Sequence, residues 1–362
     1  MPCRPGGAMR KNTEKRIRGG QRIQGHESKG KPEGMNIVIT SSDLYSKLAI
    51  TTLQSLFVNN RDADEIVVYY IGDKLSDQSR ENLTSLVAEH GREINFIPMP
   101  ERFEQLTGSN RNGQTVFCYC FFQDILPVDR VLLLEGDQIV TGNLSELYNT
   151  DIEEYYIAAA DDLQSSVYKK KIGMRKDSPY VNCGMILYNL RKWREDGLTE
   201  KISDVLRSGR HMFFYDVQDV INYTVEGGVK VLPPKYNSTT AVFLFDYRDM
   251  IRYRRPSTKC TEEEYEEGRN NPVIVHFTKN QIIQPRPWTE QCSHPYRDCY
   301  LSVRSGTVMK DEPLWKYKPG KLNRFANFLY TRVSETFTAY ALGIVHAYLY
   351  PLFLYKFLFR NK

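Results

Sequence analysis

Short apolar runs alternate with longer amphipathic stretches from residue 35 onwards. Eight runs rich in β-branched and aromatic residues predict strands over 37–40, 65–72, 94–99, 131–134, 156–160, 185–190, 230–232 and 273–276. Between the first three runs the pattern predicts two helices, over 44–58 with Asp43 as N-cap and over 77–91 with Ser76 as N-cap. Strands that alternate with helices predict an α/β fold on a largely parallel sheet.

The two ends of the chain differ from its middle. Residues 1–34 are basic and Gly-rich, which predicts a disordered leader, and Met35 is an alternative start because a strand-like run follows it directly. A basic arm for nucleic acid is the less favoured interpretation of this leader. Residues 35–313 form the predicted α/β domain, and residues 314–362 form a separate basic and aromatic segment.

Charge is distributed unevenly along the 362 residues, whose net charge is +5. Nine Lys/Arg and three acids lie in residues 1–34, and the same numbers lie in 310–362, which leaves 31 basic and 38 acidic residues between them. Proteins that bind nucleic acid usually carry their basic surface on the folded body. We therefore expect no nucleic-acid partner, and we expect the basic ends to meet anionic lipid.

The number and spacing of the cysteines indicate the cellular compartment of the protein. Seven cysteines without a Cys-x-x-Cys pair predict reduced thiols and a cytoplasmic location, and residues 1–34 lack the apolar core of a secretory signal. Cys292, His294 and Cys299 could supply three zinc ligands, but no fourth ligand lies nearby in the sequence. A plain surface loop is the preferred interpretation of these three residues.

Polar residues that directly follow apolar runs are candidates for chemistry, because ligands of parallel sheets bind outside the carboxyl ends of the strands. Glu135 and Asp137, separated by Gly136, follow one such run and could chelate a divalent cation. An ordinary solvated acidic turn is the alternative. His276 ends a later run, and Lys279 and Arg286 beyond it could hold a diphosphate.

Two further segments carry amides or acids beside apolar runs, and each suits a hydroxyl-rich ligand. The first contains Asn182 and Gly184, and the second contains Gln218 and Asp219. Polar caps and turns are the alternative interpretation of each segment.

The order of these motifs resembles glycosyltransferase family 8, in particular its bacterial lipooligosaccharide galactosyltransferases and more distantly glycogenin. The resemblance runs from Met35 to about Trp288 and is closest between Tyr168 and Arg194. It implies a GT-A-type fold with a mixed, largely parallel sheet. It also implies transfer of sugar from a UDP-sugar with retention of configuration, usually with manganese.

The resemblance assigns roles to individual positions. It implies that Glu135, Asp137 and His276 bind Mn²⁺ (or Mg²⁺), that Tyr45 stacks on uracil and that Thr40 lies near the base. It places Asp161, Asn182 and Gln218 around the donor sugar, with Gln218 on the reactive face, and Arg286 with Lys279 at the diphosphate.

Several positions depart from the family pattern. Glu135 replaces an Asp, Val217 a carboxylate beside the sugar, Tyr119 an Arg, and Ser42 and Leu44 an acid and an amide near the base. These departures keep open a catalytically degenerate relative that binds a nucleotide-sugar or glycan without turnover. A nucleotidyltransferase is a weaker alternative, because residues 40–43 are no Gly-rich phosphate loop.

The carboxyl-terminal segment predicts attachment to a lipid surface. Basic residues precede an apolar stripe at helical spacing, and no charged residue lies between Thr336 and Tyr355. A bilayer span and a helix packed on the protein's own core are the alternatives. Together these features predict a metal-dependent, retaining hexosyltransferase for lipooligosaccharide or another cell-surface glycan, peripherally attached to the inner membrane face, with a glycan or lipid-linked acceptor.

Overall fold

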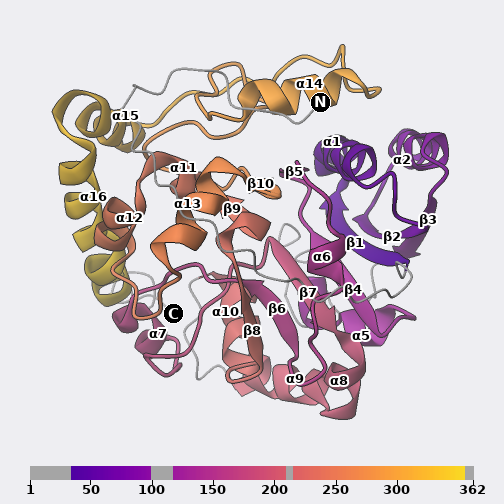
Figure 1. Cartoon of the computed structure of the whole chain (residues 1–362), viewed down its shortest axis with the longest axis horizontal. Helices are drawn as coiled ribbons and strands as arrows, with labels where there is room; N and C mark the ends of the chain where they lie inside the picture. Colours follow the sequence, from indigo (N-terminus) through magenta and orange to yellow (C-terminus); the bar gives the residue numbers. More distant parts are fainter. Residues whose placement is uncertain (1–33, 99–116, 209–214, 355–362) are drawn as a thin grey trace, which may run out of the picture.

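The computed structural model describes residues 34–98, 117–208 and 215–354. Helices pack around one large sheet (Figure 1). Seven strands form this sheet in the order β3-β2-β1-β4-β7-β6-β8. Their bounds are β1 (Met35–Ser42), β2 (Ile66–Asp73), β3 (Glu93–Pro98), β4 (Arg130–Leu134), β6 (Ile157–Ala160), β7 (Met185–Asn189) and β8 (Val229–Leu232). β7 runs antiparallel to β4 and β6, while the other neighbouring pairs are parallel. The predicted mixed, largely parallel sheet is confirmed.

A second, three-stranded sheet has the order β5-β10-β9, with bounds β5 (Gln138–Val140), β9 (Ser238–Thr239) and β10 (Ile274–His276). The sequence pattern predicts β10 but not β5 or β9, because two or three residues are too few to show an alternating pattern. β10 pairs antiparallel to β5 with His276 opposite Gln138, and parallel to β9. This register brings the end of β10 beside the turn that follows β4.

The first two helices lie close to their predicted positions, as α1 (Asp43–Asn59) and α2 (Asp77–Glu89). The N-cap of α2 is Ser76 as predicted, and its hydroxyl accepts a hydrogen bond from the Ser79 amide. The prediction of Asp43 as the N-cap of α1 is wrong, because Ser42 has the extended backbone of a cap and Asp43 is the first helical residue. The Asp43 carboxylate instead accepts hydrogen bonds from the amide and hydroxyl of Ser76, which joins the starts of both helices.

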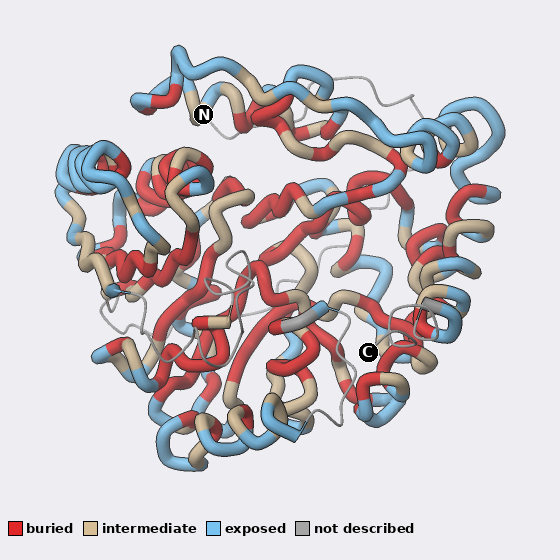
Figure 2. Tube along the Cα trace, turned by 180° about the vertical axis from the view of Figure 1, so that it is seen from behind, coloured by how far each residue is buried: buried red, intermediate tan, exposed pale blue. Residues whose placement is uncertain are grey.

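The core lies on both faces of the large sheet, because successive side chains of a strand point to opposite sides. Ile37 and Ile39 pack on the face covered by α1, whereas Val38 belongs to the cluster on the other face with Trp193. Figure 2 shows the buried residues concentrated along the central strands.

Short helices connect and cover the strands. They are α5 (Phe122–Ile125), α6 (Ser145–Tyr148), α7 (Ser166–Lys171), α8 (Leu190–Glu195), α9 (Leu198–Ser208), α10 (Asp216–Thr224), α11 (Thr240–Leu244), α12 (Tyr247–Arg254), α13 (Glu262–Asn270) and α14 (Arg297–Ser305), with the 3₁₀ turns η1 (Cys118–Cys120) and η2 (Pro234–Asn237). The carboxyl-terminal segment continues as α15 (Lys321–Phe328), η3 (Leu329–Val333), α16 (Glu335–Ile344) and η4 (Val345–Leu354).

One side of the carboxyl-terminal segment packs on the domain, and Figure 1 shows α16 alongside α12. The approach is close at Gly343, where a Cβ would lie 2.3 Å from the Arg252 carbonyl oxygen. Thr336 donates a hydrogen bond to Asp249, and Ser165 donates one to the Ala347 carbonyl oxygen. Within the described ranges, no helix has the length and hydropathy that crossing a membrane requires.

Candidate metal and sugar site

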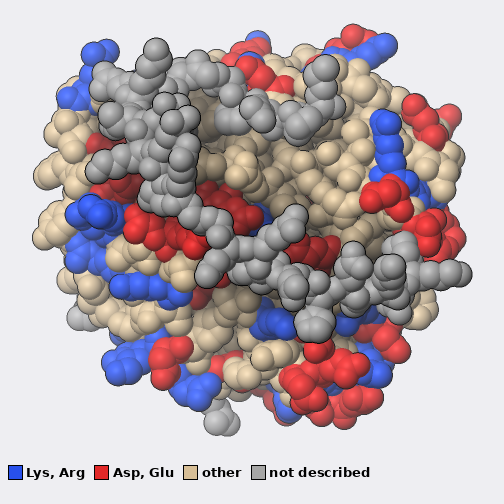
Figure 3. All heavy atoms as spheres, in the orientation of Figure 1, with Lys and Arg blue, Asp and Glu red and all other residues tan. Residues whose placement is uncertain are grey.

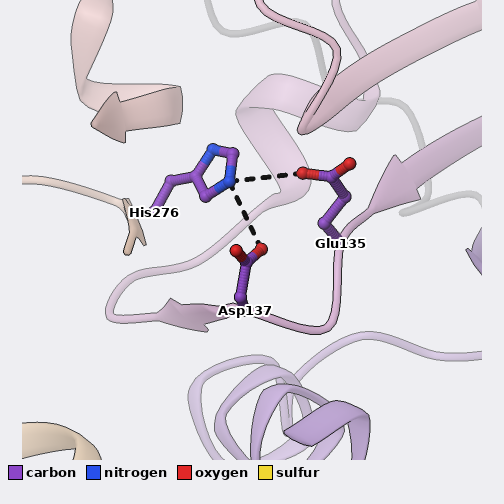
Figure 4. A group of neighbouring side chains, drawn as sticks. All are labelled: Glu135, Asp137 and His276. Atoms are coloured by element: carbon purple, nitrogen blue, oxygen red, sulfur yellow. Dashed lines mark ion pairs between the residues drawn. The ribbon is translucent and has the colours of Figure 1, made fainter. Parts of the chain in front are cut away.

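Two carboxylates and an imidazole meet where the two sheets adjoin. Glu135 and Asp137 lie in the turn between β4 and β5, and His276 is the last residue of β10. His276 Nε2 lies 3.2 Å from Glu135 Oε2 and 3.3 Å from Asp137 Oδ1, so the imidazole points between the two carboxylates (Figure 4). All three residues were candidates from the sequence pattern, and the structure brings them together.

The donor set fits a divalent cation. One ligand atom from each residue lies within 4.8 Å of the others. Adjacent ligands of an octahedral ion with bonds near 2.1 Å are about 3 Å apart, close to the two distances at His276. Carboxylate oxygens suit Mg²⁺ and Mn²⁺, and the imidazole nitrogen favours a transition-metal ion such as Mn²⁺ over Mg²⁺. Of the residues the structure describes, only this group of His, Cys, Asp and Glu side chains has such an arrangement.

Gly184 makes room for the imidazole. A Cβ at Gly184 would lie 2.1 Å from His276 Cε1 and 2.5 Å from His276 Nδ1, so a larger residue would displace the ring. The Gly184 carbonyl oxygen accepts hydrogen bonds from the Glu135 amide and the Gln138 side chain. The glycine thus fixes the turn that carries both carboxylates while it lets His276 approach.

A second layer of hydrogen bonds sets the direction of the imidazole. Asn237 Oδ1 lies 3.0 Å from His276 Nδ1 and can only accept, so Nδ1 carries a proton and Nε2 faces the carboxylates. Burial alone would lower the pKa of His276, but Asp137 and Glu135 outweigh it and raise that pKa to about 10. Burial would likewise raise the pKa of Asp137, but the charge and hydrogen bond of His276 hold it below its usual value. A cation bound by this triad would replace the proton on Nε2.

Tyr119 contacts the triad at Glu135. Its hydroxyl donates a hydrogen bond to Glu135 Oε1 over 3.1 Å and lies 3.4 Å from Thr40 Oγ1. The ring is 2% exposed, and burial followed by the Glu135 charge raises the pKa of Tyr119 well above its usual value. The phenol is therefore a neutral donor, and it holds the longer Glu135 side chain in place.

An amide network continues from the triad to Gln218. Asn237 donates to Asn182 Oδ1 over 2.9 Å, and Asn182 Nδ2 donates to Gln218 Oε1 over 3.3 Å. The Cys183 amide donates to the same Gln218 oxygen over 3.1 Å. Asn182 and Gln218, both selected from the sequence, are therefore neighbours. Asn237 could not be selected from the sequence, because one amide before a two-residue strand gives no pattern.

Asp161 lies beside this network at the end of β6. Its Oδ2 accepts from the Thr258 hydroxyl over 2.6 Å, and its Oδ1 accepts from the Leu163 amide over 2.8 Å. Burial raises the pKa of Asp161, although Thr258 and Lys169 oppose the change. Asp161, Asn182 and Asn237 line one cavity of about 30 Å³.

The comparisons with known proteins agree with this geometry. Residues 36–292 match the model of Glycosyl transferase family 8. The chain belongs to this family.

Relatives of this family 8 chain include enzymes of lipopolysaccharide synthesis. General stress protein A of Bacillus subtilis (strain 168) is 25% identical over 283 residues, 76% of this chain and 95% of that protein. Lipopolysaccharide 1,2-glucosyltransferase of Escherichia coli (strain K12) is 23% identical over 270 residues, 72% of this chain and 75% of that protein. The crystal structure of the galactosyltransferase LgtC in complex with donor and acceptor sugar analogs matches this chain with a TM-score of 0.65 at 22% sequence identity. The match covers 77% of this chain and 98% of the LgtC chain. The predicted GT-A fold is confirmed.

Of the remaining residues selected for the family 8 site, Arg286 acts on the triad directly and Thr40 reaches it through Tyr119. Arg286 stacks over Trp288 at 5.7 Å, and its charge helps to lower the pKa of Asp137. Lys279 follows β10 and is exposed. Tyr45 lies in the first turn of α1, 38% exposed, with its ring 6.0 Å from Trp315. Thr40 lies near the end of β1 and contacts Tyr119 as described above.

The zinc alternative is wrong for this family 8 chain. Cys292, His294 and Cys299 do not form a metal-binding group among the described side chains. His294 is 3% exposed, and its ring packs against Phe243 and Phe277 with centroids 5.0 and 4.9 Å away. The expected plain surface loop is wrong as well, because the loop turns this imidazole into an aromatic core.

Proposed function

We propose that this family 8 protein is a retaining hexosyltransferase that moves a hexose from a UDP-sugar to a glycan or lipid-linked acceptor of the cell surface. The observation that carries the proposal is the meeting of Glu135, Asp137 and His276 next to the linked amides of Asn182 and Gln218. A cation site beside a set of amide donors and acceptors suits a diphosphate joined to a hydroxyl-rich sugar.

At the donor end of the site, the triad would hold Mn²⁺ (or Mg²⁺), and Arg286 with Lys279 would face the diphosphate. The cation, when bound, offsets the negative charge that grows on the departing diphosphate. Arg286 adds a fixed positive charge on the same side. Tyr45 presents an exposed ring on which uracil can stack, and Thr40 lies near the base.

At the sugar end, Asp161, Asn182 and Gln218 would hold the hexose. The acceptor oxygen forms a bond to the anomeric carbon on the face from which the diphosphate oxygen departs, and the acceptor proton leaves with the products. Gln218 lacks the charge of a good nucleophile, so we assign it to orienting and polarising the groups on that face. Its oxygen already accepts two hydrogen bonds, which fixes the direction of the amide.

The carboxyl-terminal segment would attach the enzyme to the anionic inner face of the membrane, where lipid-linked acceptors lie. One side of this segment packs on α12, while Phe325, Phe337 and Tyr340 on the other side are at least half exposed. Lys and Arg lie before or between these rings, at positions 316, 318, 321, 324 and 332. Apolar rings flanked by basic residues suit the interface of an anionic bilayer.

The face drawn in Figure 3 favours membrane contact at its edge over contact through that face. Figure 3 shows acidic side chains gathered in a broad patch left of centre, with several Lys and Arg side chains nearer the left edge. α15 and α16 lie along that left edge in the same orientation (Figure 1). An anionic membrane would repel the acidic patch, so attachment through the carboxyl-terminal edge keeps the patch away from lipid.

Thermal unfolding of the full chain tests the donor site. We expect UDP with Mn²⁺, at about 100 times the dissociation constant, to stabilise the fold by about 2.7 kcal/mol, and GDP or either ligand alone to do less. The Asp137→Ala variant should lose this increment. Release of UDP from UDP-hexoses then separates the enzyme from the degenerate alternative, which would bind without turnover. Absence of any nucleotide shift in the wild type would overturn the proposal.

A further inference from the structure

Asp219, which directly follows Gln218 in α10, is a fully buried carboxylate. Two buried phenols donate hydrogen bonds to it. The Tyr168 hydroxyl lies 2.8 Å from Oδ1 and 2.9 Å from Oδ2, and the Tyr180 hydroxyl donates to Oδ1. The backbone amide of Tyr215 donates to Oδ2 over 2.8 Å. Donors from three parts of the chain therefore hold this carboxylate in place.

The phenol of Tyr180 links Asp219 to the side chain of Gln218. Gln218 Nε2 donates a hydrogen bond to the Tyr180 hydroxyl over 3.2 Å. A phenol has a single proton, and that proton is directed to Asp219, so the phenol oxygen faces Gln218 as an acceptor. Burial, followed by the charge of Asp219, raises the pKa of Tyr180 well above its usual value. The proton therefore stays on the phenol, and the direction of both hydrogen bonds is fixed.

The other end of the Gln218 amide meets donors. Its Oε1 accepts from the Cys183 backbone amide over 3.1 Å and from Asn182 Nδ2 over 3.3 Å. A backbone amide can only donate, so it faces the side-chain oxygen of Gln218 and not the NH₂ group. Tyr180 is the acceptor that faces the NH₂ group. A half-turn of the Gln218 amide would therefore lose the match at both ends.

Two further hydrogen bonds hold the chain next to Tyr180 against α10. The Val181 amide donates to Asn222 Oδ1 over 2.7 Å, and Asn222 Nδ2 donates to the Val181 carbonyl oxygen over 2.8 Å. Asn222 and Gln218 are four residues apart in α10, so they lie on one face of the helix. The separation between Tyr180 and Gln218 is therefore set by direct contact of the two chain segments.

We infer that Tyr180 is a positioning residue for Gln218, and that its phenol, directed by Asp219, holds the amide in the orientation that sugar transfer needs. This inference rests on the proposed function, because the orientation of Gln218 affects turnover only if the chain transfers a hexose. Tyr180 acts through Gln218 and needs no contact with the sugar or the diphosphate. An amide released from the phenol can turn about its last bond, so fewer molecules would hold it in the productive geometry.

Initial rates of UDP release from UDP-glucose and UDP-galactose, with Mn²⁺ present, test the inference. We expect Tyr180→Phe to lower kcat at least tenfold, while the affinity for UDP with Mn²⁺, measured by calorimetric titration, stays within twofold. Tyr168→Phe is the matched control. It removes a buried phenol from the same carboxylate, but Tyr168 is not among the described partners of the Gln218 amide. Its kcat should stay within twofold of the wild type, and thermal unfolding should show a similar loss of stability in both variants.

Selective ¹⁵N labelling of glutamine side chains gives a readout that does not depend on turnover. The side-chain signal that disappears in Gln218→Ala identifies Gln218. Tyr180→Phe should shift this signal, because the acceptor of its NH₂ group is lost, and Tyr168→Phe should leave it unchanged. In the rate assay, Tyr180→Phe combined with Gln218→Ala should be no slower than Gln218→Ala alone, because the phenol acts only through the amide.

The outcomes separate the inference from the proposed function. If the wild type turns over and Tyr180→Phe keeps its kcat, or keeps the wild-type Gln218 signal, the inference is overturned and the proposed function stands. A further loss of kcat when Tyr180→Phe is added to Gln218→Ala would also overturn the inference, because Tyr180 would then act apart from Gln218. Wild-type protein that releases UDP from neither UDP-hexose would overturn the proposed function and the inference with it.

Discussion

The hydroxyl of Tyr119 donates a hydrogen bond to Glu135 Oε1 over 3.1 Å. Both residues depart from the pattern that the sequence resembles, and the structure places them in contact. Glu is one methylene longer than Asp and has more conformers, so an external donor is needed to hold its carboxylate toward His276. The two departures therefore form one arrangement that keeps the candidate metal ligand Glu135 in position.

Tyr119→Phe should weaken Mn²⁺ binding about tenfold, because the variant removes the donor that orients Glu135. Calorimetric titration of the nucleotide-free protein with Mn²⁺ measures this directly. Tyr70→Phe is the matched control, since it removes another buried hydroxyl that bonds to Ser41 instead of the triad. Equal Mn²⁺ affinity in the wild type and Tyr119→Phe would show that Glu135 does not need the phenol.

Gly184→Ala should abolish Mn²⁺-dependent stabilisation, because the new methyl group would lie 2.1 Å from His276 Cε1. The imidazole would have to swing away from both carboxylates. Thermal unfolding with and without Mn²⁺ measures the effect. The control is Gly142→Ala, whose methyl group would meet Val273 at an ordinary 3.4 Å. A normal Mn²⁺ shift in Gly184→Ala would mean that His276 takes no part in the site.

Gln218→Ala should lower kcat at least tenfold and leave the affinity for UDP with Mn²⁺ unchanged, since the proposed function puts the amide at the sugar and not at the nucleotide. Initial rates of UDP release from a UDP-hexose, together with calorimetric titration by UDP, separate the two effects. Gln123→Ala is the control, because Gln123 is another buried glutamine whose amide bonds to Thr199. Unchanged turnover in Gln218→Ala would remove Gln218 from the mechanism.

Phe325→Ser combined with Phe337→Ser should reduce binding to phosphatidylglycerol vesicles at least tenfold, because each exposed ring can bury apolar area in the interface. The rings are 58% and 50% exposed, so the fold should keep its stability. Val231→Ser with Val308→Ser removes two exposed apolar groups outside this segment and serves as the control. Sedimentation with vesicles in low and high salt gives the measurement, and equal binding by both double variants would contradict the membrane proposal.

Burial lowers the pKa of His294 to about 3. Acid should therefore destabilise the fold. The His294 side chain takes up a proton near pH 6.5 in the unfolded chain but not in the folded chain. Its contribution to the free energy of unfolding is therefore fully present above pH 6.5 and is lost as the pH falls toward 3. Between pH 7.5 and 5.5 the loss is about 1.4 kcal/mol. Denaturant unfolding gives the free energy of unfolding of the wild type and of His294→Gln at both pH values. The difference between the two proteins should be smaller at pH 5.5 by this amount. A difference that does not change with pH would contradict the lowered pKa of His294.

The local pattern of the sequence determined most of the sheet. β-branched and aromatic runs located all seven strands of the large sheet and β10, because buried strands need apolar side chains wherever they occur. The acid pair after β4 and the imidazole on the last residue of β10 could also be predicted, since residues at or just after the end of a buried strand lie at its open edge. The cap of α1 was misplaced by one residue, because Ser42 and Asp43 are both good cap residues and only backbone geometry separates them.

Only the tertiary structure decided what these residues contact. Asn237 orients His276, and Asp162 meets Arg254 across 92 residues of sequence, because short strands and helices from distant parts of the chain pack at one edge. No periodic pattern encodes such contacts, since they depend on how separate elements are placed. The carboxyl-terminal segment shows the same division. Its apolar stripe was visible in the sequence, but the packing of its other side on α12 follows from the fit of Gly343 against a neighbouring backbone.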